Sequence, residues 1–361
     1  MNRLLQLHDA GVSIWLDMLS RDLLDSGHFA GLIRDCSVTG ATSNPTIFAK
    51  ALSSSEAYDE QIAATVPGCR DLNEAFFALA LDDVGRAADL LRPVYDATDG
   101  RDGFVSFECT PDVADNTTAT VEQALDLWDR LERPNVMIKV PATRAGVPAI
   151  EELTSRGVNV NVTLLFSVTR YDRVIDAYIR GLERRVALGR PVASVASVAS
   201  FFVSRVDAKT DPVLPAGSPL RGRMAIANAR SAYGRYVERF AGPRWSELVA
   251  AGAQAQRPLW ASTGTKDPAY SDVLYVESLI APGVINTMPE ATLRAFAEHG
   301  VVGAPMDPDP SDAEAAIREA RAVGVDVEAV AARLEREGVQ SFADSYASLL
   351  AGIAAKAKVA S

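Results

Sequence analysis

The sequence predicts an α/β protein folded as a (β/α)8 barrel, in which eight parallel strands alternate with helices. Eight short apolar or alternating segments recur along the 361 residues, and longer stretches with apolar residues at three- and four-residue spacing lie between them. Strands that alternate with helices imply a parallel sheet, and eight such repeats over this length favour a closed barrel over an open sheet. No Pro/Gly/Ser-rich linker or short-period repeat divides the chain. We therefore expect one domain over residues 1–361.

The expected elements follow one another regularly along the chain. The eight strands are expected at residues 13–19, 39–44, 103–108, 136–140, 158–164, 195–202, 258–262 and 282–287. The clearest helical stretches are residues 72–95, 117–131, 168–188 and 223–240. Residues 207–222 read as a long loop, because four Pro and Gly residues lie from Pro212 to Pro219. Beyond the eighth strand, residues 307–361 are expected to add C-terminal helices at residues 311–322, 327–337 and 341–358.

The composition argues against several classes of protein. The formal net charge of −11 disfavours nucleic-acid and anionic-membrane binding, since attraction to phosphates needs clustered Lys and Arg. Three cysteines without Cys-x-x-Cys spacing indicate neither a disulfide framework nor a zinc site. The acidic tract 307–314 lacks the ligand spacing and central glycine of a calcium-binding loop. Because the sequence shows no signal-peptide pattern and no long apolar run, we expect a cytoplasmic protein. We also expect it to bind no metal and to be a monomer or homodimer.

Side-chain alternation places a lysine inside the predicted barrel. In the fifth expected strand, Asn159, Asn161 and Thr163 alternate with apolar residues, and because both faces of a parallel barrel are covered, this polar row is expected to point inward. The same parity puts Met137 and Lys139 inside. A lysine in that position either pairs with a carboxylate or becomes neutral, and a neutral amine is the form that attacks a carbonyl carbon. The alternative is a lysine whose ammonium reaches solvent at the strand end.

Two acidic residues lie near the ends of other expected strands. Parity places Glu108 on the same face as Ser106, and Asp17 lies near the end of the first expected strand. All three histidines fall outside the expected strands, so we assign proton transfer to carboxylates rather than to imidazole. Each acid taken alone has a plainer interpretation, as part of an ion pair or as a helix cap. Together with Lys139, they predict a nucleophile and two proton-transfer groups.

Three segments carry a resemblance to a known family. Residues 40–47 read Gly-Ala-Thr-Ser-Asn-Pro-Thr-Ile, residues 136–143 read Val-Met-Ile-Lys-Val-Pro-Ala-Thr, and residues 159–167 read Asn-Val-Asn-Val-Thr-Leu-Leu-Phe-Ser. They resemble the Thr-Ser-Asn-Pro signature, the active-lysine motif and a third segment of transaldolases, in family order and at strand ends. With Asp17, Glu108 and residues 200–205, the resemblance spans residues 13–290.

The resemblance implies a TIM barrel of the class I aldolase type, with its Schiff-base lysine on the fourth strand. Such an enzyme transfers a dihydroxyacetone unit from a ketose phosphate, fructose 6-phosphate or sedoheptulose 7-phosphate, to an aldose phosphate, glyceraldehyde 3-phosphate or erythrose 4-phosphate. The reaction belongs to the non-oxidative pentose phosphate pathway. The implied substrates are therefore small sugar phosphates, and residues 1–361 are expected to form one catalytic domain.

The resemblance also implies catalytic roles for four residues. Lys139 would attack the ketose carbonyl, and Glu108 would move protons during carbinolamine formation and dehydration through a water held by Thr163. Asp17 would take the proton of the C4 hydroxyl as the C3–C4 bond breaks. The protonated imine then serves as the electron sink, so neither a metal nor an organic cofactor is implied.

Seven further residues are expected to bind substrate: Thr42, Asn44, Asn161, Ser200, Arg205, Ser262 and Lys266. Asn44 and Asn161 would hydrogen-bond substrate hydroxyls, and Arg205 offers a planar fork for a phosphate. Many relatives have Ser-x-Arg after the seventh strand, whereas here the Arg position is occupied by Gly264. Lys266 either supplies the charge as a point charge or is a surface lysine beside a glycine turn.

Three other functions compete with transfer. A related aldolase would cleave a ketose without passing the fragment on, although the length and extra helices of this chain favour a transferase. A non-catalytic sugar-phosphate-binding barrel is disfavoured, because Lys139, Asp17 and Glu108 are all present. A pyridoxal-phosphate enzyme with Lys139 holding the cofactor would absorb near the visible edge.

Overall fold

A closed barrel of eight parallel strands forms the centre of the computed structural model, which describes residues 2–360. The strands pair in chain order, and β1 closes the ring on β8. They are β1 Ser13–Leu16, β2 Val38–Thr42, β3 Val105–Glu108, β4 Val136–Pro141, β5 Val160–Leu165, β6 Ser197–Phe202, β7 Arg257–Ala261 and β8 Ile285–Met288. This confirms the predicted fold class, and all eight strands overlap the predicted segments.

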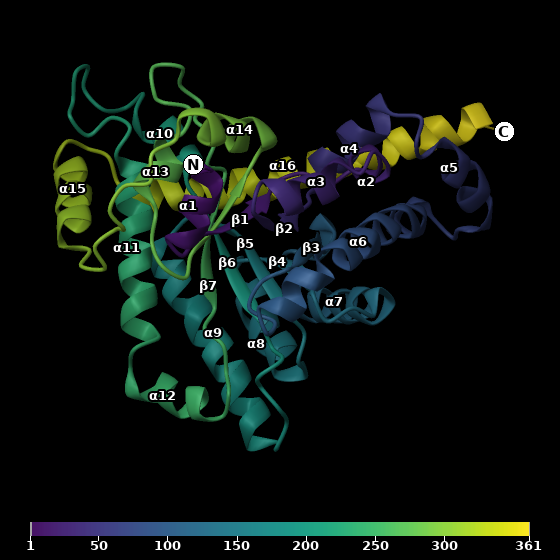
Figure 1. Cartoon of the computed structure of the whole chain (residues 1–361), viewed down its shortest axis with the longest axis horizontal. Helices are drawn as coiled ribbons and strands as arrows, with labels where there is room; N and C mark the ends of the chain where they lie inside the picture. Colours follow the sequence, from purple (N-terminus) through teal and green to yellow (C-terminus); the bar gives the residue numbers. More distant parts are fainter. Residues whose placement is uncertain (1, 361) are drawn as a thin grey trace.

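Helices surround the strands and extend beyond them (Figure 1). In chain order they are α1 Arg3–Asp9, α2 Arg21–Asp25, α3 His28–Asp35, α4 Pro45–Ser54, α5 Asp59–Thr65, η1 Val66–Gly68, α6 Leu72–Ala97, η2 Pro111–Val113, α7 Thr117–Leu131, α8 Gly146–Arg156, α9 Val168–Ala187, α10 Ser204–Thr210, α11 Met224–Arg239, α12 Pro243–Ala250, α13 Leu274–Ser278, α14 Glu290–His299, α15 Ser311–Ala322 and α16 Val327–Ala360. Figure 1 shows α16, in yellow, as a long rod that ends at the C-terminus far from the barrel. Among the described residues, no helix has the length and apolarity that crossing a membrane requires.

Two expectations about these elements were wrong. The C-terminal stretches 327–337 and 341–358 form the single helix α16, because Gly338 continues the helix instead of ending it. A glycine inside a helix costs about 1 kcal/mol relative to alanine, which packing against a neighbouring element offsets. The predicted loop 207–222 begins later than expected, since α10 continues to Thr210 before the Pro- and Gly-rich segment starts.

The strand side chains divide as the alternation predicted. Val136, Ile138 and Val140 of β4 join the large core between strands and helices, whereas Met137 faces the barrel interior with Trp15 and Phe104. A Cβ on Gly40 would overlap the Trp15 indole, so glycine is required beside this large ring. These apolar residues fill the interior below the strand ends, and a site inside the barrel is therefore confined to the carboxyl-terminal end.

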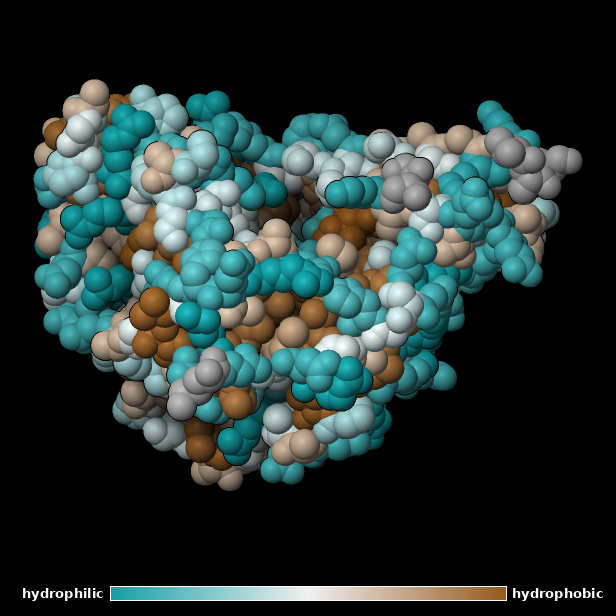
Figure 2. Space-filling model, turned by 45° about the horizontal axis from the view of Figure 1, so that its top comes forward, coloured by the Kyte–Doolittle hydropathy of each residue, from teal (hydrophilic) through white to brown (hydrophobic). Residues whose placement is uncertain are grey.

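Hydrophobic residues on the surface lie in small groups among hydrophilic ones on the face shown in Figure 2. The large apolar side chains that are most exposed, Leu188, Val213 and Val301, come from separate elements or loops. Most large apolar side chains instead lie in the two cores. Burial of this apolar surface stabilises the barrel on which the site is built.

Candidate active site

A pocket of about 320 Å³ opens at the carboxyl-terminal ends of the strands. Every strand contributes a lining residue from its last positions or from the residue that follows it. In strand order these residues include Asp17, Thr42, Glu108, Lys139, Thr163, Ser200, Ser262 and Thr287. The pocket brings together all the predicted site residues except Asn161, and it adds residues from α4 and α16.

Lys139 and Glu108 lie side by side in the pocket, and both are buried. They are paired neighbours on β4 and β3, and Lys139 is only 6% exposed. Its Nζ donates a hydrogen bond to the Ser43 carbonyl oxygen at 3.1 Å and lies 3.7 Å from Glu108 Oε1. The sequence left open whether this lysine pairs with a carboxylate, becomes neutral or reaches solvent. In the structure it is buried beside the carboxylate of Glu108.

Glu108 has an unusual environment for a carboxylate. Burial raises its pKa, Lys139 lowers it and the charge of Asp17 raises it again, so the net direction is upward. Glu108 Oε2 is buried and has no hydrogen-bond partner among the described residues. A carboxyl group with a raised pKa exchanges protons closer to neutral pH than an exposed glutamate does.

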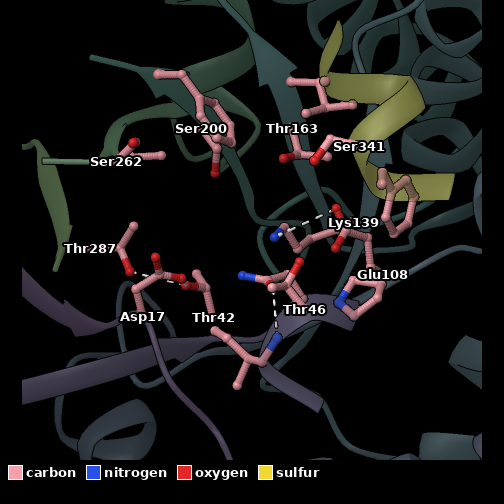
Figure 3. Close-up of a pocket in the computed structure, with 18 of the residues that line it drawn as sticks. Asp17, Thr42, Thr46, Glu108, Lys139, Thr163, Ser200, Ser262, Thr287 and Ser341 are labelled. Atoms are coloured by element: carbon pink, nitrogen blue, oxygen red, sulfur yellow. Dashed lines mark hydrogen bonds and ion pairs between the residues drawn. The ribbon is translucent and has the colours of Figure 1, made fainter. Parts of the chain in front are cut away.

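Asp17 lies across the pocket from Lys139, in a group with Thr42 and Thr287 (Figure 3). The Thr42 hydroxyl donates to Asp17 Oδ1 at 2.9 Å and lies 3.0 Å from the Thr287 hydroxyl. Because β8, β1 and β2 are adjacent, three neighbouring strands fix the orientation of this carboxylate. Sequence reasoning did not select Thr287, although the inward parity of Ile285 in the same strand provided the signal.

Asn161 lies outside the set of pocket-lining residues and is fully buried. Its side-chain amide donates to Ser106 Oγ at 2.8 Å, and its carbonyl oxygen accepts a 2.6 Å hydrogen bond from Ser200 Oγ. Ser200 itself lines the pocket. The chain Ser106–Asn161–Ser200 therefore orients the Ser200 hydroxyl from behind the pocket wall.

Two lining residues have a backbone conformation that is rare without glycine. Leu164 has φ of 53° and Ser262 has φ of 57°, and both stand at the carboxyl-terminal ends of their strands. Leu164 directly follows Thr163, where the pairing of β5 with β6 is irregular. Such left-handed residues cost of order 1–3 kcal/mol and cluster at functional sites. Both therefore mark this end of the barrel as a functional region.

Positive charge lies on the β6–β7 side of the pocket. Arg205, in the first turn of α10, stacks over the Phe202 ring with its Cζ 5.3 Å from the ring centroid. Burial lowers its pKa, and Asp17 acts in the opposite direction. Within residues 2–360, no hydrogen bond or ion pair engages the Arg205 guanidinium, so its donors can face an anion. Lys266 is exposed at the same pocket, close enough in the chain to Ser262 to share one loop.

The remaining walls come from α4 and α16. Asn44 caps α4 by accepting a hydrogen bond from the Ile47 amide at 3.0 Å, with Pro45 in the first turn, and this turn lines the pocket. Gly338, Ser341 and Phe342 line it from α16, more than a hundred residues from the other lining residues of strands β1 to β6. No sequence signal placed these three residues at the site, because only the fold brings α16 to it.

Comparison with known proteins gives a consistent result over nearly the whole chain. The family described as transaldolase/fructose-6-phosphate aldolase matches residues 14–353. A transaldolase of Frankia alni is 51% identical over 359 residues, covering 98% of this chain and 97% of that protein. Transaldolases of Parafrankia sp. and Acidothermus cellulolyticus are 51% and 50% identical, and cover 95% and 97% of this chain and 95% of each relative.

Proposed function

The chain belongs to the transaldolase/fructose-6-phosphate aldolase family and has transaldolase activity in the pentose phosphate pathway, and we propose that it works through a Schiff base on Lys139. In this proposal a dihydroxyacetone unit passes from a ketose phosphate to an aldose phosphate. The observation that carries it is the buried Lys139 amine 3.7 Å from Glu108, at the end of a barrel closed by eight strands. Its substrates are sugar phosphates.

Glu108 is proposed to move protons while the imine forms. The separation of 3.7 Å between Lys139 Nζ and Glu108 Oε1 exceeds a hydrogen bond, and Oε2 has no partner among the described residues. A water that joins Glu108 to the reacting centre fits both facts, and the Thr163 hydroxyl lines the same pocket to hold it. Such a relay protonates the departing hydroxyl of the carbinolamine and later returns the proton.

Asp17 is proposed to act in the cleavage step. When the C3–C4 bond breaks, the C4 hydroxyl becomes an aldehyde and releases a proton, which a carboxylate must accept. Asp17 stands across the pocket from Lys139 with its orientation fixed by Thr42. In the transfer step the same carboxyl group returns the proton to the new hydroxyl.

Substrate binding is proposed to use the remaining pocket residues. Arg205 provides the principal phosphate contact, and Lys266 adds a point charge where Gly264 leaves no arginine. Ser200 and Asn44 hydrogen-bond substrate hydroxyls, and Asn161 acts through Ser200, to which it is bonded. Asn161 was expected to hydrogen-bond the substrate directly; in this proposal Ser200 makes that contact and Asn161 orients Ser200.

Transfer is favoured over simple cleavage because the similar proteins named above are transaldolases. We also propose that the chain acts as one catalytic unit in the cytoplasm, as a monomer or homodimer. The three cysteines are free, which suits a reducing compartment, and α16 covers the mouth of its own barrel. Light scattering of the purified protein would measure the oligomeric state.

Borohydride trapping tests the proposed function. Incubation with fructose 6-phosphate and reduction should leave a dihydroxyacetone-derived adduct on the peptide that contains Lys139, detected by mass spectrometry. Lys139→Ala should abolish the adduct. Lys266→Ala is the matched control in the same pocket, and should keep the adduct while raising the substrate concentration needed. A folded wild-type protein that forms no adduct at saturating substrate would rule out the mechanism.

A further inference from the structure

The helix α16 lies across the mouth of the barrel. It contacts α4, η2 and α10, which follow β2, β3 and β6, and it touches β5 itself. Polar contacts hold it along its length: Ser167 Oγ to Glu328 at 2.6 Å, Lys209 Nζ to Glu337 at 2.8 Å, Thr46 Oγ1 to Ser345 at 2.8 Å and Tyr346 OH to Asn73 at 2.8 Å. The helix is therefore fixed relative to the strand ends.

One face of α16 enters the pocket. Gly338, Ser341 and Phe342 line it, and their spacing of three and four residues puts them on the same side of the helix. A Cβ on Gly338 would stand 3.0 Å from Leu164 Cδ2, so the glycine allows α16 to approach the end of β5 closely. Figure 3 shows Ser341 on this helix on the side of the pocket where Thr163 lies. Phe342 is 9% exposed and brings an apolar ring to that wall.

Beyond Phe342, α16 also closes the side of the site next to Glu108. Tyr346, one turn beyond Phe342, packs edge-on against Phe76 with ring centroids 5.5 Å apart. It lines a small cavity together with Glu108 and Phe107. The aromatic side chains of α16 thus close the side of the site at which the proposed proton relay operates, and an apolar wall there limits entry of bulk water.

Water access matters because the reaction intermediate has two fates. After the C3–C4 bond breaks, the three-carbon unit remains on Lys139 as an enamine with an electron pair available at the former C3. That carbon can attack the carbonyl carbon of an aldose phosphate, which forms the new C–C bond and leaves an alkoxide that takes a proton from Asp17. Alternatively, it takes a proton derived from water, and one water adds to the resulting imine, so that the C–N bond breaks and free dihydroxyacetone leaves the regenerated amine.

We propose that Phe342, held over the mouth by α16, keeps water from the enamine on Lys139 and so determines the ratio of transfer to cleavage. This inference rests on the proposed Schiff-base function. The apolar ring acts by excluding the proton donor that the cleavage route requires. Phe342 is thus a specificity-determining residue for the choice between two chemical outcomes rather than for the choice of sugar.

Two rates measured on the same protein test this role. One is release of dihydroxyacetone from fructose 6-phosphate without an acceptor, and the other is transfer to erythrose 4-phosphate. Phe342→Ala should raise the cleavage-to-transfer ratio about tenfold, equivalent to roughly 1.4 kcal/mol in relative barrier height. Phe342→Gln, which keeps bulk but attracts water, should also raise it and serves if the alanine variant fails to fold. Phe342→Leu should leave it near the wild-type value.

Leu349→Ala is the matched control, because Leu349 is buried on the same helix outside the pocket. Its ratio should stay at the wild-type value. An equal rise in Leu349→Ala would overturn the assignment to Phe342. An unchanged ratio in folded Phe342→Ala or Phe342→Gln, with the borohydride adduct still forming on Lys139, would overturn the inference and leave the proposed function intact. Failure of the wild-type protein to form that adduct would instead contradict the proposed function.

Discussion

Glu108 and Asp17 have the same functional group in different surroundings. Glu108 lies deep beside Lys139, where burial raises its pKa, whereas Asp17 is only partly buried and accepts a hydrogen bond from Thr42. Carboxyl groups whose environments differ in this way suit different proton-transfer steps. We therefore expect Glu108 to transfer protons while the imine forms and Asp17 to transfer the proton when the C–C bond breaks. Substitution of each residue should block a different step.

Glu108→Gln should lower kcat by roughly a hundredfold or more, because a positioned proton-transfer group typically contributes that much. The amide keeps the size of the side chain, so KM should change little. Since burial raises the pKa of Glu108, the acid limb of the wild-type kcat profile should lie above the range of an ordinary glutamate. Steady-state kinetics from pH 4 to 9 would check this, and an acid limb that persists in the variant would assign the titration to another group.

Asp17→Asn should separate imine formation from bond cleavage. The Lys139 adduct with intact fructose 6-phosphate should still be trapped by borohydride, because Glu108 is unchanged, while turnover should fall by roughly a hundredfold or more. Mass spectrometry of the reduced peptide distinguishes a six-carbon adduct from a three-carbon one. A three-carbon adduct formed at the wild-type rate would show that another group accepts the C4 hydroxyl proton.

The inward position of these residues was predictable because strand alternation has a period of two, which needs no knowledge of the fold's exact dimensions. Lys139, Glu108 and Thr163 all point where parity placed them. The same rule puts Thr287 on the face of Ile285, which lies inside the barrel, so its position also follows from alternation. The hydrogen bond of Asn161 to Ser200 depends on the spacing of two strands, which alternation does not give.

Among the elements, α10 and α11 are joined by a buried acid outside the pocket. Asp207 accepts hydrogen bonds from the Ala225 amide at 2.7 Å, in the first turn of α11, and from the Tyr275 hydroxyl at 2.9 Å. Burial is the largest influence on this carboxyl group and raises its pKa to about 6. The junction therefore depends on pH, through a group that is 2% exposed.

Asp207→Asn should change how the free energy of unfolding varies with pH. The pKa of Asp207 is about 6 in the folded protein and near 3.8 in the unfolded chain, so the folded protein binds the proton more tightly. The stabilising contribution of this group is therefore complete below pH 3.8 and is lost as the pH rises through about 6. The wild type should lose roughly 3 kcal/mol relative to the variant over that window. Urea unfolding of both proteins from pH 4 to 7 measures the difference, and parallel curves would contradict the assignment.

The helix α16 shows where element prediction from sequence stops. Its helical pattern was visible on both sides of Gly338, but the two stretches were predicted as separate helices. The packing partner of Gly338, Leu164, is far away in the sequence, so the sequence does not show the contact that accommodates a glycine inside one helix. Helices after the eighth strand were expected as elements that could cover the mouth of the barrel, but the pattern did not give which of their residues face the pocket. Ser341 and Phe342 were therefore missed as pocket residues for the same reason that the helix was divided in two.

Taken as a whole, the barrel separates function from stability along its axis. The carboxyl-terminal ends of the strands hold the pocket, with two left-handed backbone positions, whereas the amino-terminal ends are closed by a satisfied polar cluster. There the Asp102 carboxylate accepts hydrogen bonds from Ser13 Oγ, from Trp15 Nε1 at 2.8 Å and from the Gly103 amide at 3.0 Å. Eight repeats of strand and helix predict this division, since the two ends of such a barrel differ in this way generally.

Asp102→Ala should therefore lower stability and spare catalysis. The substitution removes the acceptor of buried Trp15 Nε1 and leaves Arg257, 3.9 Å away, without its carboxylate, which should cost about 3 kcal/mol of unfolding free energy. Well below the melting temperature, kcat and KM should stay near wild-type values, because the partners of the Asp102 carboxylate, Ser13, Trp15, Gly103 and Arg257, do not line the pocket. Thr287→Val at the other end provides the opposite case: it removes the contact to Thr42 and should lower kcat more than stability. Denaturant unfolding and kinetics on both variants test the division, and a large loss of kcat in folded Asp102→Ala would show that the floor of the barrel and the site are coupled.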